Sequence, residues 1–522
     1  MSLTLQSAAR LLDEHHLLRE IIAGDLWTLD ASQVDDADKP FADITYDTRT
    51  VNTGSLLCCK GRFKAEYLDG IDAHGLAAYV AETDFSSATK APGLIVNDVR
   101  KAMSLLSAEF FGRPQDNLTV IGITGTKGKT TTTYFTQAVL NAYSDGKCAL
   151  FSSVDNCLDG HTYVESDLTT PESLDAFRMM RTAVDNGMRY LVMEVSSQAY
   201  KVDRVYGLTF DVAGFLNISP DHISPIEHPT FEDYLYCKRQ IIANTKQLVY
   251  GADMAHVDLV QQDTAVHHVT ATSFALHNEG KDSGTAANTI AWPSDDAHSA
   301  YHIAIDGIDL GEYHLSIDGD FNYLNAAAAV SIAHAAGVPT DATNALHAME
   351  SVRIAGRMEQ FRDPQSNTIA IVDYAHNYAS VTALLDFVYE RYGAHNPRIT
   401  LITGSAGNKA YDRRKEIVKA AEKRIHNFIF TAEDTDTEPF IDICMEMQSY
   451  ITVPNMTSTV ISDRPTAIMN AVYDARAHAD RFNVLLIIGK GNERWIKDHN
   501  KHVPFEGDDH IVERMFNLSN GN

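Results

Sequence analysis

Residues 118–131 read LTVIGITGTKGKTT, and this stretch decides the fold of the region around it. LTVIGI is apolar and rich in β-branched residues, which predicts a short buried strand. A glycine-rich turn follows, and TTYFTQAVLNAY after it has helical spacing. This order predicts a phosphate-binding loop, because the turn brings backbone N–H groups to phosphate oxygens and the helix N-terminus adds positive charge.

Within this loop, Lys129 is expected to reach the β- and γ-phosphates of a nucleotide, and the Thr130 hydroxyl is expected to bind Mg²⁺. The spacing departs from the strict GxxxxGK[ST] pattern, since Ile123 stands where the first glycine belongs. A structural turn that happens to carry a lysine is the alternative, but the flanking strand and helix favour nucleotide binding. The predicted ATP contacts are Gly125, Thr126, Lys127, Gly128, Lys129, Thr130 and Thr131.

Further apolar runs alternate with helical segments after this loop. RYLVMEV and TFDVAGFLNI follow it, and TIAIVDYAH, RITLITGSAG, NFIFTAED and NVLLIIGKG come later in the chain. This alternation predicts an α/β fold with doubly wound, mostly parallel sheets and with functional residues at the carboxyl ends of the strands.

The chain has 522 residues, which suggests about three domains. We predict a smaller N-terminal α/β domain over residues 1–115 and a central phosphate-loop domain over 116–340. A Rossmann-like α/β domain over 341–522 completes the predicted architecture.

The net charge of the chain indicates which classes of molecule it is expected to bind. The chain carries 43 Lys and Arg against 70 Asp and Glu, a formal net charge of −27. This charge disfavours broad contact with nucleic acid or an anionic membrane, although a local basic pocket could still bind an anionic small molecule. The start lacks a signal-peptide pattern, no apolar run is long enough to span a membrane, and the six cysteines lack CxxC spacing. We therefore expect buried thiols and a cytoplasmic protein.

Two polar positions follow apolar strands close to the phosphate loop. Glu194 ends RYLVMEV, where a carboxylate is well placed to hold Mg²⁺; a surface acid at a strand end is the alternative. His222 follows Asn217 and could complete a second metal site, or it could be an ordinary hydrogen-bonded histidine. Lys238, in DYLYCKRQII, has no feature in its own surroundings that distinguishes it from a solvated helix lysine.

Three residues of the third unit are candidates for the same site. Asp373 and His376 lie in IVDYAHN, where they could contact a nucleotide or act in catalysis; capping of the following helix is the alternative. Arg357 could reach a transferring phosphate, or it could form a surface ion pair.

Together these pieces resemble the Mur ligase family, ATP-dependent amino-acid-adding enzymes of peptidoglycan synthesis, and within it the members that add the third residue. The resemblance covers nearly the whole chain. It rests on YDTR (46–49), GTKGKTT (125–131), LTTP (168–171), MEVSSQAYKVDR (193–204), NISPDH (217–222), YCK (236–238), FNYLNA (321–326), RIAGRME (353–359), DYAHN (373–377) and GKGNE (489–493).

The resemblance implies a role for each domain and for particular residues. The first domain would hold the UDP of a UDP-N-acetylmuramoyl-peptide, the central one ATP, and the third the incoming amino acid. Glu194 and His222 would be Mg²⁺ ligands, and Lys238 would be carbamylated by CO₂ so that it can hold a second Mg²⁺. Thr48 would lie at the uridine, and Thr169, Thr170, Ser196 and Arg204 would hold the UDP-sugar-peptide. Asn322, Arg357, Asp373 and His376 would contact ATP or help to position it on domain closure.

The implied reaction is a ligation on a chain expected to be monomeric. ATP would phosphorylate the D-glutamate carboxylate of UDP-N-acetylmuramoyl-L-alanyl-D-glutamate, and the amine of an amino acid would attack the resulting acyl phosphate. Lys129 and Mg²⁺ would supply the positive charge that phosphoryl transfer between anions needs.

The loop TAEDTDTEP (431–439) bears on which amino acid is added. Relatives that add diaminopimelate carry Asp-Asn-Pro-Arg there, whereas this loop has no arginine and is acidic. An acidic pocket favours a cationic side chain, so L-lysine is the first expectation, with Glu433, Asp434, Asp436 and Glu493 as its binding residues. L-ornithine and meso-diaminopimelate stay open. A ligase similar to folylpolyglutamate synthetase and a non-catalytic nucleotide-binding regulator are the remaining alternatives.

Overall fold

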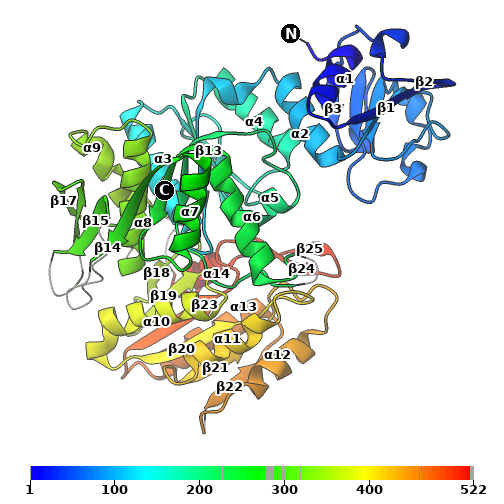
Figure 1. The fold of residues 1–522 in the computed structure, drawn as a ribbon. Coiled ribbons are helices and arrows are strands. Elements are labelled where there is room, and N and C mark those ends of the chain that lie inside the picture. The colour runs from blue at the N-terminus through cyan, green and yellow to red at the C-terminus, as the bar shows by residue number, and fades with distance from the viewer. Residues whose placement is uncertain are drawn as a thin grey trace.

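Residues 2–224, 227–277, 287–294, 298, 300–317, 319–454 and 456–517 are described by the structure, a computed structural model. They form three α/β units in chain order, each built on its own sheet (Figure 1). The predicted fold class, with a mostly parallel central sheet, is confirmed. The boundaries near residues 115 and 340 stay predictions.

The N-terminal unit has a six-stranded sheet in the order β2-β1-β6-β5-β4-β3. Strands β3 to β6 are parallel, and β1 pairs antiparallel with both β6 and β2. The elements are α1 (Leu5–Glu14), β1 (Leu18–Ala23), β2 (Leu26–Thr28), β3 (Asp43–Thr45), β4 (Ser55–Cys58), β5 (Ala78–Ala81), β6 (Gly93–Val96) and α2 (Val99–Phe110).

The central unit has an eleven-stranded sheet in the order β10-β9-β8-β11-β7-β12-β13-β14-β15-β16-β17. Its strands are β7 (Thr119–Thr124), β8 (Cys148–Phe151), β9 (Asp155–Cys157), β10 (Tyr163–Glu165), β11 (Tyr190–Glu194), β12 (Phe210–Phe215), β13 (Thr245–Gly251), β14 (Thr270–Leu276), β15 (Thr289–Pro293), β16 (Tyr301–Ile305) and β17 (Ile308–Tyr313). Its helices are α3 (Lys129–Tyr143), α4 (Ser173–Asp185), α5 (Ser197–Lys201), α6 (Phe231–Ala243), α7 (Val257–His267), α8 (Asp320–Ala335) and α9 (Thr343–Leu346).

Strand β7 lies between β11 and β12, and all three run parallel. Their carboxyl ends therefore meet at one edge of the sheet, where ligands of open α/β sheets bind. Helix α8 packs against α3 and against β13 to β15. The methyl side chains of residues 326–329, all alanine and fully buried, allow this close approach.

The C-terminal unit has a six-stranded sheet in the order β18-β19-β23-β20-β21-β22, parallel except for β18. Its elements are β18 (Glu359–Arg362), β19 (Thr368–Asp373), α10 (Tyr378–Tyr392), β20 (Arg398–Thr403), α11 (Asp412–Ala421), β21 (Asn427–Phe430), α12 (Phe440–Ser449), β22 (Thr457–Val460), α13 (Arg464–Ala477), β23 (Asn483–Ile488), the hairpin β24 (Trp495–Asp498) and β25 (Lys501–Pro504), and α14 (Asp508–Phe516).

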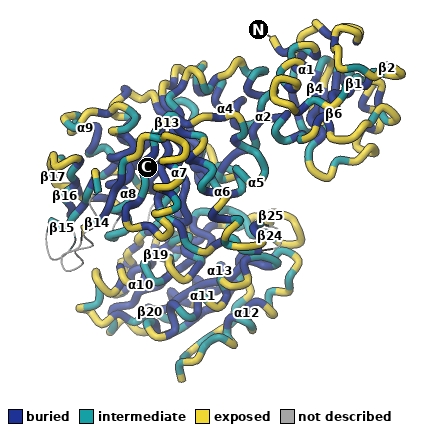
Figure 2. Tube along the Cα trace, viewed as in Figure 1, coloured by how far each residue is buried: buried dark blue, intermediate teal, exposed yellow. Residues whose placement is uncertain are grey.

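Burial follows these layers, with the strands and the inner faces of the helices buried and the outer helix faces exposed (Figure 2). One continuous cluster of buried apolar side chains includes residues of both the central and the C-terminal units, from Ile121 to Ile488.

All six cysteines are buried and unpaired, so the predicted buried thiols are confirmed. Burial raises the pKa of Cys58 and Cys444 to about 12 and that of Cys237 to about 11. Within the described ranges, no helix is both long and apolar enough to cross a membrane.

Candidate active site

The phosphate loop connects the end of β7 to the start of α3, as predicted. The backbone of Gly128 has φ +81°, and a Cβ there would meet the Asn325 side chain at 2.3 Å, so only glycine fits without strain. The Lys129 ammonium donates to the carbonyl oxygens of Gly125 at 2.8 Å and Thr126 at 3.2 Å. The lysine is thus held over the loop at the N-terminus of α3, a position that favours bound anions.

Three oxygen-bearing side chains meet beside the loop. The Thr130 hydroxyl lies 3.0 Å from the Ser153 hydroxyl, and Ser153 donates to the Glu194 carboxylate from its backbone N–H at 2.8 Å and from its hydroxyl at 3.1 Å. Glu194 is only 1% exposed. Hydroxyl and carboxylate oxygens are the ligands that Mg²⁺ prefers, so this cluster fits the predicted ion.

Lys238 reaches the same loop from α6. Its ammonium is buried and donates to the carbonyl oxygen of Gly125 at 2.8 Å, and it lies 5.0 Å from the centre of the Tyr234 ring. Burial, with the nearby Lys129 charge, holds the pKa of Lys238 well below its usual value. The uncharged amine that this favours is the form that reacts with CO₂.

His222 lies after β12 with a left-handed backbone, φ +57°. Its Nδ1 is 3.1 Å from the Glu227 carboxylate, and burial lowers its pKa, so the neutral ring is favoured. A neutral imidazole is the metal-binding form of histidine. The contact that the structure gives it is with Glu227 rather than with Glu194.

The third-unit candidates come to the same edge. Asp373 accepts the backbone N–H groups of Met358 and Ala375, both at 2.8 Å, so it fixes the segment before β18 rather than capping α10. The helix cap is Asn377. Burial raises the pKa of Asp373.

Arg357, His376 and Asn322 also lie near this edge. The Arg357 guanidinium stacks over the Tyr374 ring at 4.5 Å and donates to the Gly356 carbonyl. His376 Nε2 lies 3.3 Å from the Lys127 ammonium, which joins the third unit to the phosphate loop. Asn322 is buried in α8, where its carbonyl oxygen accepts from Asn325.

The residues expected to bind the UDP-sugar-peptide fall into two places. Thr48 lines a cavity of about 350 Å³ in the N-terminal unit, together with Tyr46, Asp47, Arg49, Lys60, Arg62, Phe63 and Tyr67. Thr170, which follows Thr169, accepts the backbone N–H of Ser196 and donates to the carbonyl oxygen of Glu194, both at 3.0 Å.

Arg204 is engaged within the central unit. It pairs with Glu172 at 2.8 Å and donates to the Thr170 carbonyl. Lys60 of the N-terminal unit pairs with the same Glu172 at 2.6 Å. This carboxylate therefore ties the two units together beside the predicted substrate site.

The predicted amino-acid pocket is less acidic than its sequence indicates. The buried Lys490 ammonium lies 2.8 Å from Asp434, forms an ion pair with Glu493, and stands 4.2 Å from the centre of the Trp495 ring. Asp436 pairs with Lys497 at 3.0 Å. Cations of the chain itself thus already neutralise much of the acidic loop.

Glu433 differs from these acids. It is 7% exposed, and its Oε2 is buried without a hydrogen-bond partner. Burial, with the Asp434 charge beside it, raises the pKa of Glu433 despite Arg464, Lys490 and Arg413 nearby. An unpartnered buried carboxylate is costly to the fold and marks a place where a cationic group would be stabilised.

Several residues of this site carry no signal in the sequence that would single them out. Ser153, Glu172, Lys490 and Arg413 pair with partners far away in the chain, and such pairings are set by packing. Asp221 is the exception, because it stands beside His222 in NISPDH and could have been noticed there.

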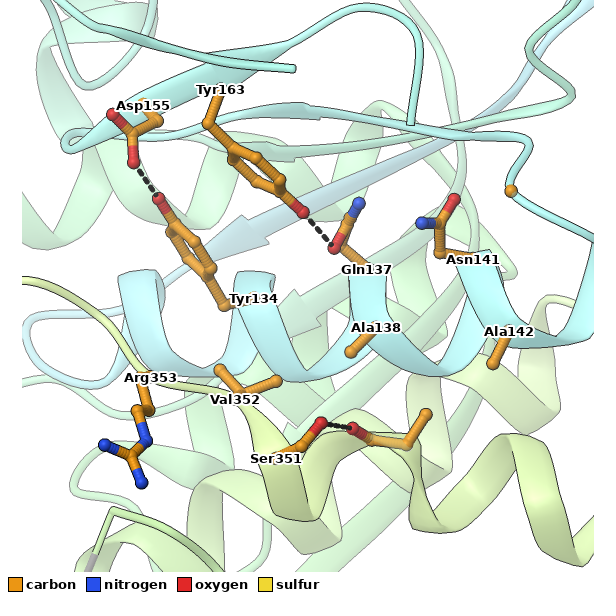
Figure 3. Close-up of a pocket in the computed structure, with 12 residues that line it drawn as sticks. Tyr134, Gln137, Ala138, Asn141, Ala142, Asp155, Tyr163, Ser351, Val352 and Arg353 are labelled. Atoms are coloured by element: carbon orange, nitrogen blue, oxygen red, sulfur yellow. Dashed lines mark hydrogen bonds between the residues drawn. The ribbon is translucent and has the colours of Figure 1, made fainter. Parts of the chain in front are cut away.

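A cavity larger than the one lined by Thr48 lies elsewhere. It has about 540 Å³ and runs along α3, between the hairpin that bears Asp155 and Tyr163 and the segment that ends at Arg353 (Figure 3). Tyr134 donates to Asp155 at 2.8 Å and Tyr163 donates to Gln137 at 3.2 Å across it. None of the predicted site residues lines this cavity.

Comparison with known proteins identifies the family. A sequence profile of the Mur ligase middle domain matches residues 123–333, and one for the Mur ligase, glutamate ligase domain, matches residues 356–491. A UDP-N-acetylmuramyl-tripeptide synthetase of Bifidobacterium longum (strain NCC 2705) is 77% identical over 518 residues, 99% of this chain and 100% of its own. The chain belongs to the Mur ligase family.

Other relatives of this Mur ligase agree in length and fold. The UDP-N-acetylmuramoyl-L-alanyl-D-glutamate–L-lysine ligase of Enterococcus faecalis (strain ATCC 700802 / V583) is 38% identical over 523 residues, which cover all of both chains. A solved UDP-N-acetylmuramoyl-L-alanyl-D-glutamate–2,6-diaminopimelate ligase has a similar fold, with a TM-score of 0.64 at 20% identity over all of both chains. This Mur ligase is therefore an enzyme with the fold of its family.

Proposed function

We propose that this Mur ligase adds L-lysine to the D-glutamate of UDP-N-acetylmuramoyl-L-alanyl-D-glutamate, with ATP as the phosphoryl donor. The observation that carries the proposal is the contact of Lys127 in the phosphate loop with His376 of the third unit, the unit that holds the buried Glu433, whose Oε2 has no hydrogen-bond partner. The names of the relatives from Bifidobacterium longum and Enterococcus faecalis support the choice of UDP-linked dipeptide over folate. These relatives match the full length of the chain.

The chemistry explains why these residues are needed together. A carboxylate is a poor acyl donor, so the D-glutamate carboxylate must first become an acyl phosphate. Lys129 would contact the transferring phosphoryl group, and Thr130 and Glu194 would hold Mg²⁺. Bound Mg²⁺ would supply positive charge that offsets the phosphate oxygens. Docking of the third unit would exclude water, which would otherwise hydrolyse the acyl phosphate.

The lysine assignment rests on the charges of the third-unit pocket. Glu433 is the acid of this pocket whose Oε2 lacks a hydrogen-bond partner, and it would receive a cationic group of the amino acid. The loop 431–439 contains no arginine that could pair with a second substrate carboxylate. L-ornithine would satisfy the same carboxylate, whereas meso-diaminopimelate would bring an extra negative charge beside Asp434 and Glu493.

Purified enzyme with ATP, Mg²⁺ and the UDP-linked dipeptide should release phosphate with L-lysine, less with L-ornithine, and least with meso-diaminopimelate. Preference for meso-diaminopimelate would overturn the lysine assignment. Absence of phosphate release with every amino acid would contradict the ligase activity, and binding of folate in place of UDP would favour the folylpolyglutamate alternative.

We further propose that Lys238 is carbamylated. Because burial lowers its pKa, its uncharged form is available near neutral pH; as the pH falls through that lowered pKa, protonation removes the reactive amine. Lys238→Ala should lose activity by about 10²–10³-fold, since a charged group beside the phosphates is lost, and short carboxylates should restore part of it. Lys246→Ala is the control, because Lys246 pairs with Asp211 on the surface of the same unit. Full activity of Lys238→Ala without added carboxylate would rule the carbamate out.

A further inference from the structure

Asp221 is a buried carboxylate at the junction of the central and C-terminal units. It follows β12, is 8% exposed, and accepts two hydrogen bonds from the Arg413 guanidinium, at 2.7 and 3.2 Å. The side-chain amide of Asn377 donates to its other oxygen at 3.1 Å, and the Lys127 ammonium lies 3.5 Å from that oxygen. One carboxylate thus gathers partners from two units.

The partners from the C-terminal unit stand at the N-terminal ends of helices. Asn377 caps α10 with its carbonyl oxygen while its amide nitrogen points to Asp221. Arg413 lies in the first turn of α11. Both are far from Asp221 in the chain, by 156 and 192 residues, so these contacts exist only while the two units are docked.

His376 of the C-terminal unit contacts Lys127 and so joins the phosphate loop to the cluster around Asp221. His376 Nδ1 lies 2.7 Å from the Tyr374 carbonyl oxygen and must be the protonated nitrogen, because a carbonyl can only accept. Nε2 is then the acceptor for the Lys127 ammonium at 3.3 Å. Lys127 therefore contacts Asp221 and His376 together, one from its own unit and one from the other.

Arg413 extends the cluster toward the amino-acid pocket. Its positive charge acts on Lys127, where it helps burial lower the pKa to about 8, and on Glu433, whose raised pKa it partly offsets. The charge of Arg413 thus acts both on the loop expected to hold ATP and on the carboxylate expected to hold the incoming amine.

We propose that Asp221 is a positioning residue that anchors Arg413 and Asn377 against the phosphate loop, so that the amino-acid pocket and the phosphate loop are assembled into one site by domain docking. The proposal rests on the proposed ligase function. Asp221 would act through its partners and would contact none of the three substrates. Its loss should therefore leave substrate binding to the first two units intact and slow the step that needs all three.

A double-mutant cycle tests this coupling. Asp221→Asn and Arg413→Met should each lower kcat by roughly 30-fold or more, the low end of the loss expected when one partner of a buried charge pair is removed. KM for the UDP-linked dipeptide should change less than about threefold, because its expected contacts lie outside this interface. The double variant should be no slower than the slower single variant, since both remove the same interaction.

Control variants distinguish the proposed positioning role of Asp221 from a general loss of structure in the enzyme. Arg398 and Asp474 form an ion pair of the same length, 2.7 Å, that is more exposed and lies within the C-terminal unit, so Arg398→Met and Asp474→Asn should leave kcat nearly unchanged. Arg413→Lys keeps the charge but not the two-pronged geometry, and its kcat should be intermediate. The proposal would be overturned if the fold-decrease in kcat of the double variant equalled the product of the two single-variant decreases. Unchanged kcat in either single variant would also overturn it.

Small-angle scattering tests docking without reference to the ligation reaction. With Mg²⁺ and a non-hydrolysable ATP analogue, Asp221→Asn and Arg413→Met should show a larger radius of gyration than the wild type, while Asp474→Asn should not. Identical radii in all proteins would contradict the proposal even if ligation is confirmed. The wild type could fail to ligate lysine and still have a smaller radius of gyration than Asp221→Asn and Arg413→Met. That result would overturn the proposed function but not the docking role of Asp221.

Discussion

At the scale of single residues, Glu433 is the acid that we propose receives the cationic group of the amino acid, and it is buried with its Oε2 unpartnered. Its pKa is raised in the folded enzyme, so the native state binds more protons than the unfolded chain between the usual and the raised pKa. Stability therefore falls as the pH rises through that window. The ionised carboxylate is a cost to the fold that bound substrate would offset.

Glu433→Gln should raise KM for lysine by about 10- to 100-fold, the loss expected for a hydrogen bond to a charged group. The same change should increase the free energy of unfolding by about 1–2 kcal/mol near pH 8, and this gain should vanish as the pH is lowered. Steady-state kinetics and chemical denaturation at several pH values measure both effects.

Glu438→Gln is the matched control, because Glu438 pairs with the buried Arg414 guanidinium at 2.7 Å and its loss should destabilise the enzyme. A Glu433→Gln variant that is less stable and keeps its KM would show that Glu433 is structural.

The phosphate loop and the polar ends of the strands could be predicted because each depends on a local pattern. The pairing of Lys490 with Asp434 could not, because the two residues are 56 positions apart in the chain and only packing brings them together. The acidic loop therefore looked more negative in the sequence than it is in the fold. Arg413 was missed for the same reason, whereas Asp221 stands beside His222 in NISPDH and could have been noticed.

At the scale of elements, the two ends of α3 are both bounded by glycines with left-handed backbones. Gly128 precedes the helix with φ +81°, and Gly146 follows it with φ +79°. A Cβ at Gly128 would meet Asn325 at 2.3 Å, whereas a Cβ at Gly146 would meet nothing within 4 Å. Comparing substitutions at these two glycines therefore distinguishes the cost of a left-handed backbone from the cost of a clash with Asn325.

Gly146→Ala should cost about 1–2 kcal/mol of stability from the left-handed backbone alone. Gly128→Ala should cost more, and it should also weaken ATP binding, because Asn325 and the loop must move apart. Thermal unfolding and nucleotide titration of both variants test this, and equal losses at the two glycines would contradict the role of Asn325.

The elements themselves could be predicted well because apolar strands and helical spacing are local properties. The order of strands in the sheets could not, since β7 lies between β11 and β12 only after the crossovers are made. That order brings Glu194 to the phosphate loop from 65 residues further along the chain.

At the scale of the whole molecule, Glu172 joins the N-terminal unit to the central one. Lys60 reaches it at 2.6 Å across the boundary and stands 4.0 Å from the centre of the Tyr46 ring, and Arg204 holds it from the other side. Tyr46 and Lys60 also line the cavity of Thr48. Lys60 therefore belongs both to the ion pair that joins the two units and to the lining of the predicted uridine site.

Lys60→Met should raise KM for the UDP-linked dipeptide about tenfold, because a charged hydrogen bond is lost, and should leave KM for ATP unchanged. Lys64→Met is the control, since Lys64 pairs with Glu66 on the exposed surface of the same unit. If Lys60→Met raised KM equally for the UDP-linked dipeptide and for ATP, the ion pair with Glu172 would not organise the UDP site. The same conclusion would follow if Lys64→Met raised KM for the UDP-linked dipeptide as much as Lys60→Met does.

The burial of every cysteine has a practical consequence. Thiol reagents attack the thiolate, and thiols that are shielded from solvent and have raised pKa values react slowly. A cysteine introduced at an exposed position on each of two units would thus be the preferred site for a fluorophore or spin label in the native enzyme. Distances between the units could then be followed during turnover, with the six natural cysteines left in place.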